Sequence, residues 1–398
     1  AYTVNLQTDR YRYLLGFCAT LLSGGCTLMP ADRLQVTLSQ LSTEYPGCHV
    51  LGENAPEFDG LQSNARADAI PEIPADQQAV IAFTSGSTGK PRPNIKYWET
   101  LLTGTANNVD LLAVGAPEDS SQPRVNFVAT VPCQHMWGLE TVILLPLLSR
   151  VAACHRSPFY PQDIADALAS LPGPRALVSS PIHLEALARA EVELPPLHCV
   201  YSATAPLLPE QAGLLEEAFN APLIDVFGFS EAGIIASRRA SSDDLWRIGP
   251  KLTISAAARG YEIKGPHLAG AVPMPDRIEQ VGPGHFRWLG RNQDMIKIAG
   301  KRGSLADLNR KLLGIDGVID GVIFAPSDNC RRLAALVVTD GLSTSAVIEP
   351  LRREIDAVFM PRPVFRVPRL PRQETGKLSR SATLELFEHC RAKQSGAA

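Results

Sequence analysis

The chain has 398 residues, of which 45% are hydrophobic and 20% are charged, which is ordinary for a soluble globular protein and excludes a chain disordered throughout. Its 38 Lys and Arg and 41 Asp and Glu leave a net charge of −3, which argues against a dedicated nucleic-acid binder because such domains are normally basic. The length predicts two or three domains, and eight cysteines without a CxxC pair predict reduced thiols in a cytoplasmic protein.

The predicted elements alternate along the first part of the chain. Residues 14–31 form the longest uncharged stretch, but Gly24-Gly25 and Pro30 interrupt it, so we interpret it as a buried helix, a turn and a strand rather than a membrane span. Short apolar strands then alternate with helices of about ten residues, which predicts a parallel α/β sheet covered on both faces, with ligands at the carboxyl ends of its strands. Strands are predicted at 26–29, 80–83, 125–131, 151–154, 176–179, 198–202 and 223–227, and helices at 11–22, 139–148, 163–170, 182–190 and 209–219.

After about residue 243 the pattern changes. Residues 261–264, 277–280 and 285–288 alternate in the way that half-exposed antiparallel strands do. The sequence therefore predicts an α/β fold with a large N-terminal domain over 1–291, which has parallel α/β sheets and a small antiparallel β portion, and a smaller mobile α+β domain over 292–398.

The segment 84–91, TSGSTGKP, follows a predicted strand. Alone it is either a flexible surface loop or a loop that offers backbone N–H groups, hydroxyls and one ammonium to a polyphosphate. It is not a P-loop, because Thr84 stands at the place of the first glycine and Pro91 at the place of the final Ser or Thr.

Two further loops carry charged residues. GFSEAG at 228–233 follows a strand and approaches a nucleophile elbow, but Ala232 replaces the second glycine. Glu231 is either an exposed acid or a ligand for magnesium, since hard cations prefer carboxylate oxygens. LPRQETGKLSR at 370–380 places Lys377 in a loop that contains glycine and proline, where a lone lysine is usually solvated.

The first two loops, then LGRNQD at 289–294, then the loop with Lys377 follow one another along the chain. In this order they resemble the motifs of the adenylate-forming superfamily: acyl- and aryl-CoA synthetases, adenylation domains of peptide synthetases and firefly-type luciferases. The resemblance covers residues 11–388, and such proteins usually begin earlier, so we expect an N-terminal piece to be absent. It implies an AMP-forming acid–thiol ligase that uses ATP and Mg²⁺. A carboxylate attacks the α-phosphorus and releases pyrophosphate, and a thiol then displaces AMP.

The resemblance also implies roles for residues at matching positions. Lys377, His135 and Glu231 would be catalytic, with Glu231 as the metal ligand. Lys297 and Gly300 would face the thiol channel, and Gln293 or Asp294 would be the hinge about which the small domain turns. The positions that match ATP and AMP binding are Thr84, Ser85, Gly86, Ser87, Thr88, Gly89, Lys90, Ser202, Ala203, Thr204, Phe227, Gly228, Phe229, Ser230, Asp276 and Arg291.

Besides Arg92-Pro93, which replaces the Lys-Gly after the family's phosphate loop and which we expect to be tolerated, two positions depart from the family's pattern. Pro275 precedes Asp276 where the family has glycine, and Gln293 stands where the hinge usually has Asp or Lys. These departures keep open a non-catalytic nucleotide- or acyl-binding relative. A more distant alternative is an α/β-hydrolase that uses Ser230 with His267 or His285.

The segment 132–138, PCQHMWG, matches the stretch that borders the acyl pocket in acid-activating members. No acidic residue lies between Val125 and Leu139 to hold an ammonium, which argues against an α-amino acid. An apolar wall that includes Met136 suits a small aromatic or medium-chain aliphatic carboxylic acid. The residues implied for the acyl pocket are His135, Trp137, Ala203, Phe229 and Ile234.

The segment 297–308, KIAGKRGSLADL, resembles the branch found in aryl-polyene and xanthomonadin-type pigment pathways. That branch activates 4-hydroxybenzoate or a related aryl acid and loads it onto an acyl carrier protein. Coenzyme A as the thiol, and a medium-chain fatty acid as the substrate, are the alternatives. Eight basic and three acidic residues between positions 351 and 381 suit docking of an acidic carrier protein or of the phosphates of coenzyme A, or simply a solvated basic face.

Overall fold

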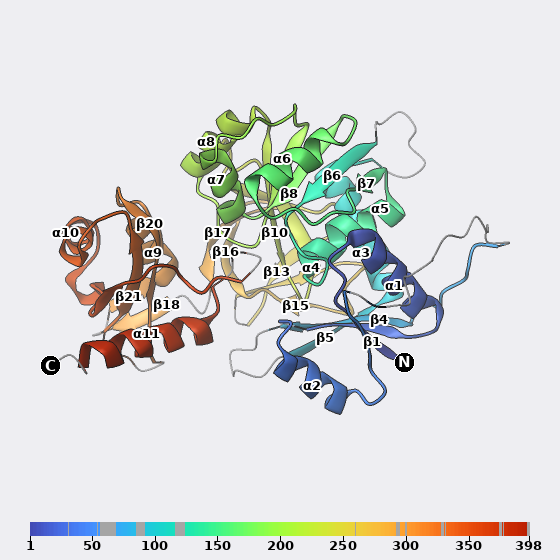
Figure 1. Cartoon of the computed structure of the whole chain (residues 1–398), viewed down its shortest axis with the longest axis horizontal. Helices are drawn as coiled ribbons and strands as arrows, with labels where there is room; N and C mark the ends of the chain where they lie inside the picture. Colours follow the sequence, from blue (N-terminus) through green and yellow to red (C-terminus); the bar gives the residue numbers. More distant parts are fainter. Residues whose placement is uncertain are drawn as a thin grey trace. The chain divides into compact units, whose positions relative to one another are not determined.

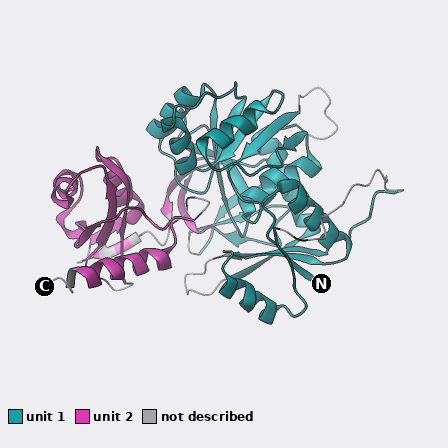
Figure 2. Cartoon of the chain, in the orientation of Figure 1, with its two compact units in different colours: residues 1–273, 280–287 teal, residues 274–279, 288–398 magenta. Residues whose placement is uncertain are grey.

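The computed structural model describes residues 1–30, 32–53, 55, 69–84, 92–115, 124–258, 260–291, 295–298, 301–327, 330, 332–373, 376 and 378–395. The chain forms two compact units (Figure 2). Unit 1 comprises Ala1–Pro273 and Gln280–Arg287, and unit 2 comprises Met274–Glu279 and Trp288–Ala398. Two domains divided at residue 291 remain a prediction.

A five-stranded sheet in the order β3-β1-β2-β4-β5 begins unit 1 (Figure 1). Its first four members in that order are parallel, and β5 returns antiparallel to β4. Helix α1 (Arg10–Leu22) begins at Asp9, whose side chain accepts a hydrogen bond from the Arg12 N–H, and it buries Tyr13 and Phe17. The strands are β1 (Tyr2–Asn5), β2 (Cys26–Met29), β3 (His49–Leu51), β4 (Gln78–Thr84) and β5 (Arg92–Tyr97), and a second helix is α2 (Gln35–Glu44).

A nine-stranded sheet follows in the order β16-β17-β12-β11-β10-β9-β8-β6-β7. Strands β6 to β10 run parallel, and β11, β12 and β17 continue the sheet as antiparallel neighbours. The predicted mixed α/β fold with parallel sheets is confirmed. The strands are β6 (Val125–Ala129), β7 (Val151–Ala153), β8 (Arg175–Ser179), β9 (Cys199–Ser202), β10 (Leu223–Phe229), β11 (Gly233–Arg238), β12 (Leu245–Ile248), β16 (Asp276–Gln280) and β17 (His285–Arg291).

Helices cover both faces of this sheet because consecutive strand residues are apolar and point to opposite sides. Leu177 and Val200 pack with α6 (Pro161–Ala169), α7 (Pro181–Arg189) and α8 (Pro209–Phe219). Val178 and Tyr201 pack instead with residues of α3, η2 and α1. The elements on this second face are α3 (Trp98–Leu112), α4 (Met136–Gly138), the π-helix η2 (Leu139–Leu144) and α5 (Leu145–Leu148).

Some elements differ from the prediction. The stretch 14–31 contains the end of α1 and the whole of β2, and within the ranges given above no helix has the length and apolar character needed to cross a membrane. Helix α3 was not predicted. Residues 139–148, predicted as one helix, form η2 and α5. A small antiparallel portion is confirmed, formed by β13 (Thr253–Ala256), β14 (Tyr261–Lys264) and β15 (Val272–Pro273). Of the predicted antiparallel strands only 261–264 lies in it, whereas 277–280 and 285–288 belong to β16 and β17 of the nine-stranded sheet.

Unit 2 has an α+β architecture. Leu312 of α9 and Leu351 of α10 pack with Val337 of β21, whereas Phe387 of α11 packs with Leu336. Adjacent residues of one strand therefore face helices on opposite sides of a three-stranded sheet. The elements are β18 (Met295–Ile298), β19 (Lys301–Ser304), α9 (Leu305–Leu313), β20 (Val318–Phe324), β21 (Ala334–Thr339), α10 (Thr344–Glu354), the 3₁₀ turn η4 (Ala357–Phe359), β22 (Val364–Arg366) and α11 (Arg380–Ser395).

A buried ion pair fixes β10 to β11. Arg238 donates to Asp225 Oδ2 from Nε at 3.3 Å and from Nη2 at 3.1 Å, and the Asp225 side chain is 3% exposed. Replacing Asp225 by alanine leaves the Arg238 guanidinium without its counter-ion, so we expect a loss of about 3 kcal/mol in the free energy of unfolding. Urea unfolding measures this loss. The exposed pair Asp244–Arg287 is the control, and Asp244→Ala should cost less than about 1 kcal/mol. Equal losses in the two variants would contradict the prediction.

Candidate functional site

The predicted phosphate-binding segment connects two neighbouring strands. Thr84 at the end of β4 pairs with Arg92 at the start of β5. For Thr84 the structure describes the main chain only. The predicted phosphate-binding residues that lie outside the described residues are Ser85, Gly86, Ser87, Thr88, Gly89 and Lys90.

The second predicted loop is a tight turn between β10 and β11. Phe229 pairs with Gly233, and the Ala232 N–H donates to the Phe229 carbonyl at 3.0 Å. Gly233 has φ +75°, and a Cβ on Gly228 would lie 2.5 Å from the Gly233 oxygen. Glycine is therefore required at both ends of this turn. Glu231 is exposed in it, and Ser230 is half-buried.

Three polar side chains from other elements hold the main chain of this turn. Lys96 Nζ of β5 donates to the Glu231 carbonyl at 2.6 Å. His267 Nε2 lies 3.1 Å from the Ala232 carbonyl oxygen, and Glu140 Oε1 of η2 accepts from the Ile234 N–H at 3.1 Å. These contacts bring the β4–β5 hairpin of one sheet to the end of β10 in the other.

Burial shifts the pKa of each of the three groups in the direction that favours its neutral form. It lowers the pKa of Lys96, although Glu140 and Glu231 oppose this shift. It raises the pKa of Glu140, against the hydrogen bonds from the Ile234 N–H and Asn108 and the charge of Lys96. It also lowers the pKa of His267. Lys96 and Glu140 were not predicted as site residues from the sequence. The available signal was Glu140, a lone acid in the otherwise uncharged run 136–149.

The end of β9 lies beside the end of β10. Ser202 pairs with Asp225 in the parallel β9–β10 ladder, so Ser202, Ala203 and Thr204 leave the sheet at the same edge as the Glu231 turn. Thr204 has φ +82°, which is an unusual conformation for a β-branched residue. Strained backbone of this kind concentrates at functional sites. This placement is consistent with the role expected for these residues, which stays a prediction.

His135 lies at the start of α4. Its Nδ1 accepts from the Trp137 N–H at 3.2 Å, which leaves Nε2 to carry the proton in the neutral ring. A Cβ on Gly138 would approach the Pro132 oxygen to 2.0 Å, so glycine is needed for this compact bend. Of the predicted acyl-pocket residues, Trp137, Ala203 and Ile234 belong to one buried cluster that also contains Met136. Phe229 is only half-buried.

Other predicted residues have structural contacts of their own. Phe227 packs at 5.3 Å against Trp246 and at 5.5 Å against Phe286, measured between ring centroids. His267 contacts the Ala232 main chain, and His285 of β17 pairs with Arg247 of β12. None of these contacts joins either histidine to Ser230, the nucleophile of the hydrolase alternative.

The remaining predicted residues belong to the second half of the chain. Asp276 is buried, and its Oδ1 accepts from Trp288 Nε1 at 2.9 Å. Arg291 and Lys297 are described by their main chains alone, in β17 and β18. The predicted residues outside the described part are Gln293, Asp294, Gly300 and Lys377.

The residues on either side of Lys377 form a closed loop. Arg372 and Leu378 make an antiparallel bridge, and Arg372 Nη1 donates to the Gly376 carbonyl at 2.9 Å. Arg372 also donates to both carboxylate oxygens of Asp320 in β20, at 2.6 and 2.8 Å. Gly376 has φ +78°. The loop thus begins and ends at one point of unit 2, which is fixed by an ion pair to its central sheet.

The donor set suits magnesium held together with substrate phosphates. Among the described residues no three His, Cys, Asp or Glu side chains gather as a closed metal site requires. Magnesium in phosphate-transfer sites usually has one or two carboxylate ligands and takes the rest from phosphate and water. An exposed Glu231 carboxylate, on a turn whose main chain is already held, fits this pattern.

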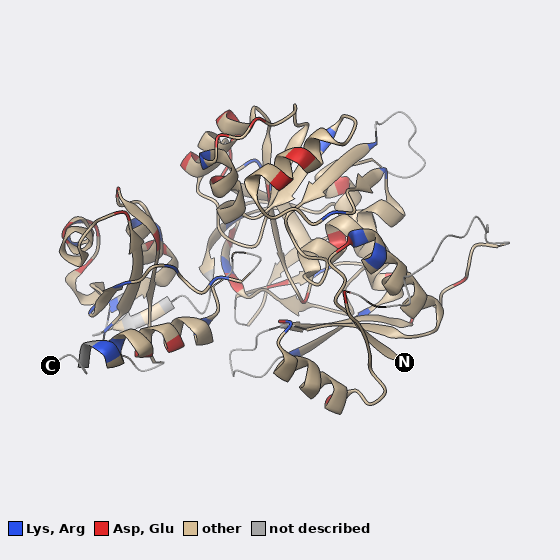
Figure 3. Ribbon diagram, viewed as in Figure 1, with Lys and Arg blue, Asp and Glu red and all other residues tan. Residues whose placement is uncertain are grey.

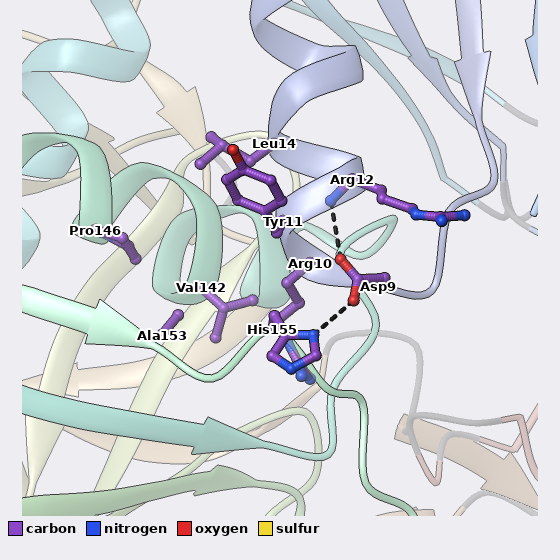
Figure 4. A pocket seen from close by; sticks show the side chains of 9 residues that line it. All are labelled: Asp9, Arg10, Tyr11, Arg12, Leu14, Val142, Pro146, Ala153 and His155. Atoms are coloured by element: carbon purple, nitrogen blue, oxygen red, sulfur yellow. Dashed lines mark hydrogen bonds and ion pairs between the residues drawn. The ribbon is translucent and has the colours of Figure 1, made fainter. Parts of the chain in front are cut away.

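A pocket of about 450 Å³ lies elsewhere in unit 1, between the start of α1, η2, α5 and the end of β7 (Figure 4). Asp9 Oδ2 and His155 Nδ1 meet there at 2.7 Å. Arg10 is buried and donates to the carbonyls of Ala129 and Val131 at 2.7 and 3.3 Å. The guanidinium therefore joins strand ends, and no predicted site residue lines this pocket.

Proteins similar to the chain include CoA ligases. The chain is 28% identical over 324 residues to 4-coumarate–CoA ligase of Halorhodospira halophila, which covers 78% of each sequence. In fold it resembles ATP-bound MatB from Rhodopseudomonas palustris, with a TM-score of 0.79, 19% identity and coverage of 97% of this chain and 88% of the other. It also resembles a benzoate CoA ligase from Burkholderia xenovorans, with a TM-score of 0.73, 17% identity and coverage of 98% and 89%.

The model of a protein family described as "AMP-binding enzyme" matches residues 21–264. This segment contains the β4–β5 connection, the π-helix and the Glu231 turn. The chain belongs to the AMP-binding enzyme family and is an AMP-forming acid–thiol ligase.

Proposed function

We propose that this ligase activates an aryl acid that carries a hydrogen-bonding ring substituent, such as a hydroxybenzoate. It forms the acyl-AMP from ATP and transfers the acyl group to a thiol of an acyl carrier protein or of coenzyme A. Activation of an acid by ATP and its ligation to coenzyme A agree with the family and its relatives. The proposals of an aryl acid as the substrate and of a carrier protein as the thiol donor go beyond what those comparisons show.

The observation that carries the substrate proposal is the indole of Trp137. Trp137 is 4% exposed, and its Nε1 has no hydrogen-bond partner among the described residues. A buried donor without a partner is costly, and a ligand that accepts its hydrogen bond removes that cost. Trp137 belongs to the apolar cluster of the predicted acyl pocket, so an aryl acid with an acceptor on its ring fits better than a plain fatty acid. A relative and a similar structure are a 4-coumarate–CoA ligase and a benzoate CoA ligase, and both names specify an aryl acid.

The proposed chemistry assigns the chain's own residues to two steps. In the first, a carboxylate oxygen bonds to the α-phosphorus and the bond to the β-phosphate oxygen breaks. Lys377 supplies positive charge to this step, and the segment 84–90 binds the leaving phosphates. Glu231 would hold Mg²⁺, which neutralises phosphate charge when bound. In the second step the thiol sulfur attacks the activated carbonyl and AMP leaves. His135, with its proton on Nε2, would border the carboxylate.

A carrier protein is our preferred thiol donor because unit 2 is basic near its end. Arg352, Arg353, Arg362 and Arg366 are exposed in or near α10 and β22, and Figure 3 shows Lys and Arg along unit 2. Acidic partners are steered to such surfaces. Transfer to an acidic carrier protein should then fall when Arg362 and Arg366 are replaced by glutamate.

Acid-dependent exchange of pyrophosphate into ATP tests the substrate. We expect 4-hydroxybenzoate to exceed benzoate in kcat/KM, and Trp137→Phe to reduce that preference by about tenfold, because it removes one hydrogen bond and keeps the aromatic ring. Trp246→Phe is the matched control. It removes another buried indole N–H without a partner among the described residues, in a residue outside the predicted pocket, and should leave the preference unchanged.

Each other outcome has a definite meaning. A preference for octanoate over every benzoate would replace the aryl proposal with a medium-chain fatty acid. Equal preferences in Trp137→Phe and the unaltered enzyme would remove the role of the indole. An absence of exchange with every acid would favour a non-catalytic relative.

A further inference from the structure

The turn that carries Ser230 and Glu231 is held at three main-chain positions by side chains of other elements. Lys96 binds the carbonyl of Glu231, His267 binds that of Ala232, and Glu140 binds the N–H of Ile234. These side chains come from β5, from the segment after β14 and from η2. No pair of them is close in sequence.

Hydrogen bonds between charged side chains and these main-chain atoms carry a large cost in desolvation free energy. A neutral donor or a water molecule would serve the Glu231 carbonyl, whereas an ammonium and a carboxylate removed from water each carry a large desolvation cost. Glu140 is 8% exposed, and burial shifts the pKa of both groups toward the neutral form. Lys96 is near enough to Glu140 for each to favour the charged form of the other.

The local backbone is also built around Glu140. A Cβ on Gly233 would lie 2.6 Å from Glu140 Oε1, so the missing side chain at Gly233 makes room for this carboxylate. Glu140 itself lies in a π-helix, a rare conformation that is frequent at functional sites. Asn108 Nδ2 of α3 makes a further, long contact of 3.4 Å with Glu140 Oε1.

We propose that Lys96 and Glu140 are positioning residues for the Ser230–Glu231 turn. They fix its main chain, and thereby set the direction in which the Ser230 and Glu231 side chains leave it. This inference rests on the proposed role of that turn in binding the nucleotide and its metal. Neither Lys96 nor Glu140 contacts substrate in this account. Both act through the turn.

The test compares Lys96→Met, Glu140→Gln and the double variant Lys96→Met/Glu140→Gln. Methionine keeps the length of the side chain without its donor. Glutamine keeps an acceptor for the Ile234 N–H without the charge. The double variant leaves no unpaired buried charge, so it keeps the test valid if Lys96→Met alone does not fold. Lys251→Met, at an exposed lysine of unit 1, is the control.

Three measurements are needed, and the first two do not depend on activity. Hydrogen exchange of the amides in 230–234 reports the turn itself, and should become about tenfold faster in Lys96→Met and in the double variant. The dissociation constant of ATP, measured with and without Mg²⁺ in the absence of acid, should rise by about tenfold with Mg²⁺ and by less without it. The KM for the acid should change much less than the KM for ATP.

The outcomes separate this inference from the proposed function. Unchanged amide exchange in the double variant would overturn the positioning role, even if the enzyme is an active ligase. Faster exchange with no change in ATP affinity would also overturn it, since the turn would then be structural only. If the unaltered protein failed to activate any acid, the proposed function would fall, but the amide exchange and ATP affinity would still decide the positioning role.

Discussion

Replacing Lys377 by alanine is expected to lower acyl-AMP formation by about 10²–10³-fold. Negative charge accumulates at the α-phosphate as the carboxylate attacks, and a cation placed there stabilises that transition state more than the ground state. Transfer of the acyl group from supplied acyl-AMP to the thiol does not need this charge, so it should be nearly unaffected. Pyrophosphate release measures the first step, and AMP release from synthetic acyl-AMP measures the second.

The loop around Lys377 makes this a clean substitution. Its ends are joined by the Arg372–Leu378 bridge, and Arg372 is held by Asp320; both contacts are made by other residues and are kept when 377 is alanine. Lys393→Ala is the control, because Lys393 is exposed on α11 of the same unit, and it should leave both steps unchanged. Equal loss of both steps in Lys377→Ala would show that the lysine supports the fold or the thiol transfer rather than adenylation.

The sequence predicted seven strands of the two large sheets because each is a short, continuous apolar run, but it missed β1 and β3, which are only four and three residues long. Strand β8 is Arg175–Ser179 where 176–179 was predicted, and β10 is Leu223–Phe229 where 223–227 was predicted. Burial on both faces removes the need for alternation, and this pattern is visible in a single sequence.

Helix α3 was missed because its composition hides its buried face. Trp98–Leu112 contains Gly104, and it buries Thr105, Asn107 and Asn108 beside its leucines. These residues are weak helix formers, and as polar residues they do not mark an apolar stripe. Tertiary packing rather than local propensity stabilises such a helix.

The sequence located the Glu231 turn but not what supports it. Lys96 and Glu231 are 135 positions apart, and Glu140 and Ile234 are 94 apart. A single lysine after a strand and a single acid in an apolar helix are each most simply interpreted alone. Only the three-dimensional arrangement of β5, η2 and β11 shows that Lys96 and Glu140 contact the same turn.

Removing the carboxylate of Glu231 is the second large effect that we expect. Glu231→Ala should lower acyl-AMP formation by about 10²–10³-fold and raise the Mg²⁺ concentration required for half-maximal rate, because the ion loses its proposed protein ligand. Transfer from supplied acyl-AMP should be affected far less. A magnesium titration of pyrophosphate release measures the effect, and Glu217→Ala, at an exposed acid on α8, is the control.

This variant also separates the role of the Glu231 carboxylate as a metal ligand from the role of the side chains that hold the main chain of the turn. Lys96 binds the main-chain oxygen of Glu231, so alanine at 231 keeps that hydrogen bond and the turn should stay folded. Glu231→Ala should therefore change the magnesium dependence without faster amide exchange in 230–234, whereas Lys96→Met/Glu140→Gln should change both. A normal magnesium dependence in Glu231→Ala would place the ion on other residues. The supported turn would then serve to bind the nucleotide alone, through Ser230 and the main chain.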